Sequence, residues 1–275
     1  MTPQEYFELN GLFDLNVLKD FAQLHSVYVI QSPRYPDLAM LHYMDECQYE
    51  NKWDVFSRMS RGMIVDLKSK KIIAHPFNKF FNLGQMPETQ FDVLQWKGHF
   101  TVTEKLDGSM LILFRDPTSG ENRMTTKGSF DSEHGLFATS ILPETLKDSK
   151  WTSQGTFIFE LIEKKYQIVI DYAKKGYPSG LYLIGYRGLD GRLATYPELV
   201  AIAKEMGVYV PREYAFLSLD ALVKSAETLS VLDEGYVLRY KDDFLVKVKG
   251  TEYIRVHRFI SKLSDRNLIE SLKTG

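Results

Sequence analysis

The 275-residue chain has very little cysteine, no marked excess of charge of either sign, and no long apolar run. The single cysteine, Cys47, excludes a disulfide framework and a cysteine metal cage, and it fits a reducing compartment. The six histidines show no ligand spacing, which argues against a zinc site. With a formal net charge of −2, contact with nucleic acid requires a local basic surface.

Membrane signals are also missing. No apolar run is long enough to span a bilayer, and Met1–Leu9 lacks the basic and then apolar pattern of a signal peptide. We therefore expect a soluble intracellular protein, located in the cytoplasm, with no membrane partner.

The pattern of apolar residues predicts a mixture of strands and helices, in a chain whose length fits one large domain or two small ones. Strands are expected at 27–30, 63–67, 72–74, 100–102, 110–114, 123–127, 155–162, 168–170 and 180–187, and a hairpin at 235–249. Helices are expected at 133–142, 196–206 and 218–229.

The segment Thr103-Glu104-Lys105-Leu106-Asp107-Gly108-Ser109 presents one lysine at a turn between two predicted strands. An unperturbed lysine has a pKa near roughly 10.4, and burial or neighbouring cations lower that value in lysines that act as covalent catalysts. Gly108 would let the backbone approach a ligand closely, and Asp107 could orient a sugar hydroxyl or a metal-bound water. The segment predicts attack by Lys105 on a nucleotide α-phosphate; the alternative is a solvated turn.

A phosphate clamp is expected upstream of this segment. Arg58 and Arg61 precede a buried strand, and guanidinium forks hold phosphate oxygens bidentately. Lys79 could contact phosphate while a neighbouring phenyl face stacks on a purine, which stabilises by about 1–3 kcal/mol. The alternatives are a solvated strand end for the arginines and a core position for one of Phe80 and Phe81.

Two later segments also contain charged side chains that are expected to face a ligand or an ion. Glu160 is the only carboxylate of a nearly all-apolar strand, so it is expected to face a site, a cation or a hydroxyl; the alternative is a strand-end glutamate paired to a lysine. In the hairpin, Lys247 and Lys249 project from one face of the second strand, and Val246 and Val248 from the other. Two lysines side by side repel one another unless an anion lies between them, and the alternative is a solvated face.

Taken in order, these segments resemble the motifs of the covalent nucleotidyltransferases, the superfamily of ATP-dependent ligases and mRNA-capping guanylyltransferases. Lys105-x-Asp107-Gly108 resembles motif I, the strand with Glu160 motif III, residues 180–187 motif IIIa, Glu234-Gly235 motif IV, and Lys247-x-Lys249 motif V. Ser60-Arg61-Gly62, Lys79-Phe80-Phe81-Asn82 and Thr126-Lys127-Gly128-Ser129 are similar to segments of the first-type RNA ligases of T-even phages. The resemblance to that ATP-dependent RNA ligase family covers residues 58–257.

The resemblance implies an α+β fold: a nucleotidyltransferase domain of the ATP-grasp-like ligase adenylation type, with antiparallel sheets flanked by helices. We expect an adenylyltransferase domain at 1–250, with a family-specific lead-in at about 1–55, and a short helical tail at 251–275 without an OB-fold. T-even RNA ligases continue into a helical domain that helps select a broken tRNA. Only residues 251–275 follow the motifs here, so the chain is expected to be either a minimal ligase or a fragment, and tRNA specificity is not implied in either case. A monomer is expected, in the host cytoplasm if the protein is phage-encoded.

For function, the resemblance implies joining of 5′-phosphate and 3′-hydroxyl RNA ends, on single strands or broken hairpins, in RNA repair. Lys105 would be the catalytic residue, with ATP and Mg²⁺ or Mn²⁺ as cofactors. The ATP-binding residues implied are Arg61, Lys79, Phe81, Glu104, Asp107, Gly108, Lys127, Glu160, Glu234, Lys247 and Lys249. Glu234 and Glu160 would hold the metal, mostly through water. A DNA ligase, a capping-type enzyme and a catalytically silent nucleotide- or RNA-binding relative remain open. Ser109 is typical of RNA ligases, whereas ATP-dependent DNA ligases usually have an arginine where this chain has Met110.

Overall fold

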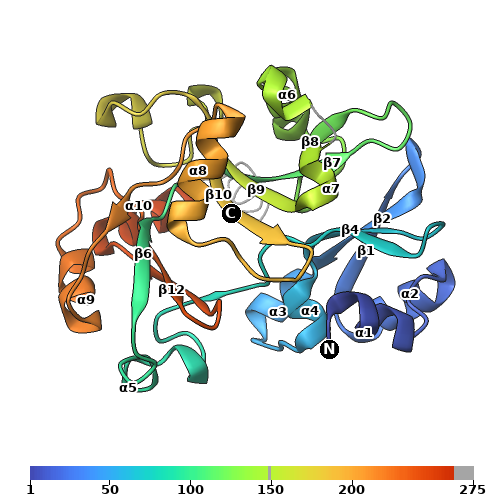
Figure 1. The fold of residues 1–275 in the computed structure, drawn as a ribbon. Helices are drawn as coiled ribbons and strands as arrows, with labels where there is room; N and C mark the ends of the chain where they lie inside the picture. Colours follow the sequence, from blue (N-terminus) through green and yellow to red (C-terminus); the bar gives the residue numbers. More distant parts are fainter. Residues whose placement is uncertain (148–149, 263–275) are drawn as a thin grey trace, which may run out of the picture. The chain divides into compact units, whose positions relative to one another are not determined.

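The computed structural model describes residues 1–147 and 150–262, and the chain folds into two compact units, each assembled from three separate stretches of sequence. Unit 1 comprises Met1–Lys79, Ser109–Leu161 and Gly180–Val210. Unit 2 comprises Phe80–Gly108, Ile162–Ser179 and the chain from Pro211 onward. Figure 1 shows the strands and helices of both units, coloured along the chain. The prediction of one adenylyltransferase domain over residues 1–250 stays a prediction.

The first sheet of unit 1 has the strand order β1-β2-β3-β4, and every neighbouring pair in it is antiparallel. Its strands are β1 (Val27–Ser32), β2 (Tyr35–Tyr43), β3 (Arg61–Asp66) and β4 (Lys71–Ala74). The helices of this part of the chain are α1 (Pro3–Leu9), α2 (Leu15–Leu24), α3 (Asp45–Tyr49) and α4 (Val55–Met59). A capping box between Thr2 and Glu5 begins α1, and the Asp14 side chain caps α2.

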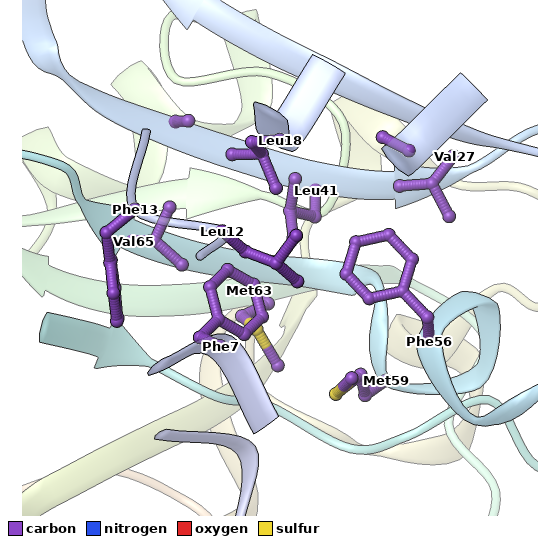
Figure 2. Packing of buried hydrophobic residues seen from close by; sticks show 12 residues of the cluster. Phe7, Leu12, Phe13, Leu18, Val27, Leu41, Phe56, Met59, Met63 and Val65 are labelled. Atoms are coloured by element: carbon purple, nitrogen blue, oxygen red, sulfur yellow. The ribbon is translucent and has the colours of Figure 1, made fainter. Parts of the chain in front are cut away.

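Strand β3 is buried on both faces, and its alternating side chains join two different cores. Met63 and Val65 pack in a cluster with Phe7 of α1 and Phe56 of α4 (Figure 2). Ile64 points the other way, into a cluster that also contains residues of β2 and β7. Burial on both faces explains why the three central residues of this strand, Met63-Ile64-Val65, are all apolar.

The second sheet of unit 1 has the order β10-β9-β7-β8. Its strands are β7 (Ser109–Arg115), β8 (Asn122–Thr126), β9 (Gly155–Ile162) and β10 (Gly180–Gly188). The helices are α6 (Glu133–Ser140), α7 (Lys150–Gln154) and α8 (Tyr196–Met206), with the 3₁₀ helix η2 at Glu144–Lys147. Ser132 caps α6 at the predicted position, and α8 has the predicted bounds.

Unit 2 is built on a five-stranded sheet with the order β11-β6-β12-β13-β5. Its strands are β5 (Phe81–Asn82), β6 (Phe100–Glu104), β11 (Glu213–Tyr214), β12 (Gly235–Tyr240) and β13 (Leu245–Lys249). Its helices are η1 (Pro87–Thr89), α5 (Phe91–Leu94), η3 (Lys164–Tyr166), η4 (Tyr172–Lys175), α9 (Leu219–Glu227) and α10 (Thr251–Lys262). Buried side chains of α9 and of the β6-β12-β13 strands form the core, and β5 pairs in parallel with β13.

The predicted fold class, α+β with antiparallel sheets and flanking helices, is confirmed, and so are the predicted hairpin β12-β13 and the three predicted helices. The strands on either side of Lys105 are also confirmed, but they belong to different sheets. The predicted strand at 168–170 is wrong, because that segment is irregular. In the described part of the chain, no helix has the length and apolar content to cross a membrane.

Candidate active site

Lys105 directly follows β6 in unit 2, and its backbone is tied to the strand beside it. Its N–H donates to the carbonyl of Gly235 at 2.8 Å, which extends the pairing of β6 with β12 by one residue. Gly235 has φ +138°, and a Cβ there would lie 2.1 Å from the carbonyl oxygen of Val248. This position therefore needs glycine. The close approach of the backbone to β13 at Gly235 brings the preceding residue, Glu234, next to that strand.

Glu234 is shared between two lysines. Its Oε2 lies 2.7 Å from Lys105 Nζ, and its Oε1 lies 2.9 Å from Lys249 Nζ. The glutamate side chain is 3% exposed, whereas the two lysines are 20% and 25% exposed. The structure therefore brings Lys105, Glu234 and Lys249 together, as one buried carboxylate with two ammonium groups at its edge.

Strand β13 presents its two lysines on the face opposite to its core valines, as predicted. Lys247 Nζ lies 4.5 Å from the ring centre of Phe80, and Lys249 Nζ lies 5.2 Å from that of Tyr253. Both distances are within the range of cation–π attraction. Phe81 is 3% exposed, whereas Phe80 is half-buried, so Phe80 offers the more accessible aromatic face next to these lysines.

Glu104 is buried and held by residues that the sequence analysis did not single out. Lys175 Nζ lies 2.6 Å from its Oε1, and the Tyr177 hydroxyl donates to its Oε2. Lys175 also lies 2.7 Å from Asp233, next to Glu234. Burial works against the charged form of Lys175, but hydrogen bonds to Asp233 and Glu104 outweigh it and raise the pKa of this lysine. Burial and the Glu104 carboxylate raise the pKa of Tyr177.

Asp107 uses both of its carboxylate oxygens within unit 2. Oδ2 accepts the backbone N–H groups of Val169 and Ile170, at 2.9 and 3.2 Å, and Oδ1 accepts the hydroxyl of Tyr253 at 2.7 Å. Its backbone N–H donates to the hydroxyl of Tyr172. Burial raises the pKa of both tyrosines, so each keeps its proton at neutral pH. Asp107 therefore fixes the turn that carries Lys105, and the predicted sugar or metal contact of Asp107 stays a prediction.

Unit 1 contains a separate basic cluster. Lys79 Nζ lies 2.9 Å from Gln48 Oε1 and 4.8 Å from the ring centre of Trp53. Lys127 and Arg61 are half-buried, and burial lowers the pKa of each. The three cations of this cluster, Arg61, Lys79 and Lys127, add to burial in lowering the pKa of His42 to about 3.

Glu160 occupies the middle of β9, where it pairs with Met110 of β7. The negative charge of Glu160 favours the charged forms of Arg61 and Lys127 and so opposes the effect of burial. Burial is the larger effect, and the pKa of each cation is lowered overall. Gly62 allows close packing here, since a Cβ at this position would lie 2.8 Å from Lys127 Cα. The structure therefore brings Arg61, Lys79, Lys127 and Glu160 together in unit 1, and Lys105, Glu104, Asp107, Glu234, Lys247 and Lys249 in unit 2.

The acidic and imidazole side chains of the described residues bear on the predicted metal site. No group of three or more His, Cys, Asp or Glu side chains is arranged to hold one among residues 1–147 and 150–262. In unit 2 the carboxylates of Glu104, Asp107 and Glu234 contact lysines, hydroxyls or N–H groups. The predicted metal roles of Glu234 and Glu160 stay predictions.

Lys175, Tyr177 and Tyr172 could not be found from short-range patterns, because each contacts a residue more than sixty positions away. Tyr253 had a weak signal: it lies four residues after Lys249, in the first turn of a predicted helix that follows directly on the hairpin.

The sequence of this chain is similar to those of two curated proteins. A protein of Thermovibrio ammonificans, provisionally named an RNA ligase, is 32% identical over 214 residues, which cover 73% of this chain and 53% of the relative. A protein of Autographa californica nuclear polyhedrosis virus, provisionally named a bifunctional polynucleotide kinase/RNA ligase, is 24% identical over 77% of this chain and 32% of the relative. The chain thus spans about half or less of the length of these curated relatives.

Solved structures share the fold. Form 1 of an archaeal ATP-dependent RNA ligase superposes with a TM-score of 0.63 at 15% identity, over 92% of this chain and 65% of the other. A family model described as RNA ligase matches residues 59–253, which include every residue discussed above from Arg61 to Tyr253. With most of its length matched by that model, the chain belongs to the RNA ligase family.

Proposed function

We propose that this chain is an ATP-dependent RNA ligase, which joins 5′-phosphate and 3′-hydroxyl RNA ends through a Lys105–AMP intermediate and an adenylylated RNA end. The observation that carries the proposal is the position of Lys105. Its side chain is 20% exposed at the end of a strand, and its Nζ lies 2.7 Å from Glu234, which also holds Lys249. The match of the chain to the RNA ligase family supports the same activity.

In the first step, Lys105 Nζ attacks the α-phosphorus of ATP. A nitrogen–phosphorus bond forms, and the bond from phosphorus to the oxygen of pyrophosphate breaks. Lys105 must lose a proton for this attack, and Glu234 Oε2 is an acceptor within hydrogen-bond distance. Lys249 and Lys247 can then offset the charge of the phosphates, because positioning and charge neutralisation supply most of the catalysis in phosphoryl transfer.

The next two steps use RNA. An oxygen of the 5′-phosphate attacks the phosphorus of Lys105–AMP, which forms a 5′-5′ pyrophosphate linkage and returns the lysine as a free amine. The 3′-hydroxyl of the other end then attacks the RNA phosphate, and AMP leaves with the oxygen of the broken linkage. The RNA ends proposed are those of single strands or of broken hairpins.

ATP and Mg²⁺ or Mn²⁺ are the proposed cofactors. A divalent ion would neutralise phosphate charge, and Mg²⁺ is commonly held by substrate phosphates and water with only one or two carboxylates. The carboxylates around Lys105 already contact cations or hydrogen-bond donors, so we propose that ATP brings most of the ligands of this ion.

The test is covalent labelling with ATP that is radioactive at its α-phosphate, in the presence of Mg²⁺ or Mn²⁺. We expect covalent label that stays on the wild-type protein through denaturing electrophoresis, none on Lys105→Ala, and wild-type label on Lys174→Ala, whose side chain is 73% exposed. Label from GTP instead would indicate a capping-type enzyme, and preferred sealing of nicked duplex DNA would indicate a DNA ligase. Binding of ATP without label would indicate a catalytically silent relative.

A further inference from the structure

Unit 2 contains a groove that extends from the lysines of β13 onto helix α10. Its volume is about 430 Å³, within the range of about 300–1,000 Å³ in which small ligands bind. Side chains of β5, β13, α9 and α10 line it. The groove therefore includes Lys247 and Lys249 but continues along α10, beyond the motif residues.

The charge of the groove favours an anion. Lys247, Lys249 and Arg258 contribute three positive charges, of which that of Lys249 is shared with Glu234, and His257 adds an imidazole. Among the residues that the structure describes around the groove, Glu227 is the one carboxylate. A phosphate is the anion that these side chains recognise best, because lysine and arginine bind phosphate oxygens through charge-assisted hydrogen bonds.

The remaining lining suits a nucleoside. Leu83, Val223 and Ile254 provide an apolar wall. Asn82, at the β5 side of the groove, donates its side-chain N–H to Gln85 at 2.9 Å. The Asn82 Oδ1 atom is buried and accepts no hydrogen bond from the residues that the structure describes. A buried acceptor of this kind matches a donor such as a ribose 2′-hydroxyl or a base N–H.

We propose that this groove binds the terminal nucleotide of an RNA strand, with the phosphate at Arg258 and His257 and the sugar and base against the apolar wall. The proposal rests on the proposed function and names where the RNA lies in it. Tyr253 and Arg258 are five residues apart on α10, which separates them by about 7 Å along the helix axis. An RNA strand is long enough to extend along this part of α10. ATP, in contrast, must place its α-phosphate at Lys105.

The experiment compares three variants of the full chain with the wild-type protein. Arg258→Ala removes an exposed charge from the groove, and Ile254→Trp fills its apolar part. Arg255→Ala is the matched control, since it removes the same charge from the same helix but pairs with Glu252 and does not line the groove. Thermal unfolding verifies that each variant is folded.

Two readouts separate RNA from ATP. The first is the affinity for a fluorescent, 5′-phosphorylated single-stranded oligoribonucleotide, measured by anisotropy over a range of salt concentrations. The second is the labelling of Lys105 by α-labelled ATP, followed by transfer of that AMP to the same RNA. We expect Arg258→Ala to weaken RNA affinity about ten-fold and to lower the salt slope by about 0.7 to 1, with labelling of Lys105 unchanged. Ile254→Trp should slow AMP transfer to RNA, and Arg255→Ala should behave as wild type.

Unchanged RNA affinity and transfer in Arg258→Ala and Ile254→Trp would overturn the groove proposal, even if Lys105 is labelled normally. Loss of Lys105 labelling in both variants would also overturn it, because the groove would then serve ATP. If the wild-type protein takes no label from ATP but loses RNA affinity on Arg258→Ala, the groove is supported and the proposed ligase activity is wrong.

Discussion

The hydroxyl of Tyr253 donates a hydrogen bond of 2.7 Å to Oδ1 of Asp107, although 146 positions separate the two residues. Asp107 lies two residues after Lys105, and Tyr253 is 1% exposed in the first turn of α10. The same tyrosine ring faces Lys249. One side chain thus connects α10 both to the turn that carries Lys105 and to the hairpin that carries Lys249.

Tyr253→Phe should therefore affect both stability and chemistry. The change leaves a buried carboxylate oxygen without its donor, which costs about 1–3 kcal/mol of the free energy of unfolding. We also expect slower labelling of Lys105, because the turn is less well fixed. Tyr240→Phe is the control: that hydroxyl makes a long hydrogen bond of 3.4 Å to Leu94 within the same unit. Equal labelling rates in the two variants would contradict the positioning role of Tyr253.

Glu234→Gln should reduce labelling of Lys105 by about 100-fold or more, because it removes the carboxylate that holds Lys105 and Lys249 and that can accept the proton of Lys105. Glu213→Gln, on an exposed residue of β11, should label like the wild type. The initial rate of covalent labelling at saturating ATP measures the effect. A rate within three-fold of wild type, roughly 0.6 kcal/mol, would show that Glu234 has no part in the chemistry.

The sequence alone was enough to predict those site residues that belong to a short, regular pattern. Lys247 and Lys249 share a face because side chains alternate along a strand, and Glu234 stands at the start of the same hairpin. These local rules fixed the hairpin and its lysine pair, and the resemblance to known motifs added Lys105.

The contacts that hold Lys105 in place could not be predicted from the sequence in this way. Lys175 reaches Glu104 across 71 positions, and no local periodicity predicts such a contact. The segment at 168–170 reads as a strand from its apolar residues, yet its N–H groups donate to Asp107. Tertiary hydrogen bonds override the local preference there.

Stability should fall as the pH drops below about 6.5. Burial, with nearby cations adding to it, lowers the pKa of His42 to about 3; burial and Arg187 do the same for His75. In the unfolded chain a histidine has a pKa near about 6.5, so between these values the unfolded state binds more protons and is favoured by acid. Each histidine contributes a slope of up to about 1.4 kcal/mol per pH unit in this window.

The measurement is urea unfolding of the wild-type protein and His42→Gln from pH 7 to about pH 5, a window in which most carboxylates stay ionised. The free energies of unfolding of the two proteins should differ most at pH 7 and approach each other as the pH falls. The variant keeps His75 but lacks His42, so acid destabilises it less than the wild type. Parallel curves would contradict a buried neutral His42.

Lys175→Met should be the most destabilising single lysine change in unit 2. Lys175 is 12% exposed and contacts Glu104 and Asp233, and removing it leaves the buried Glu104 carboxylate with only Tyr177 among the partners described above. Breaking one side of a buried ion pair costs about 3–5 kcal/mol. Lys174→Met is a matched control on the adjacent residue, whose side chain is 73% exposed and lies 3.8 Å from Asp171, so a change of about 0–1 kcal/mol is expected. Because Glu104 directly precedes Lys105, Lys175→Met should also slow covalent labelling at temperatures where the variant is still folded. Equal unfolding free energies for the two variants would contradict a stabilising role for the contact of Lys175 with Glu104.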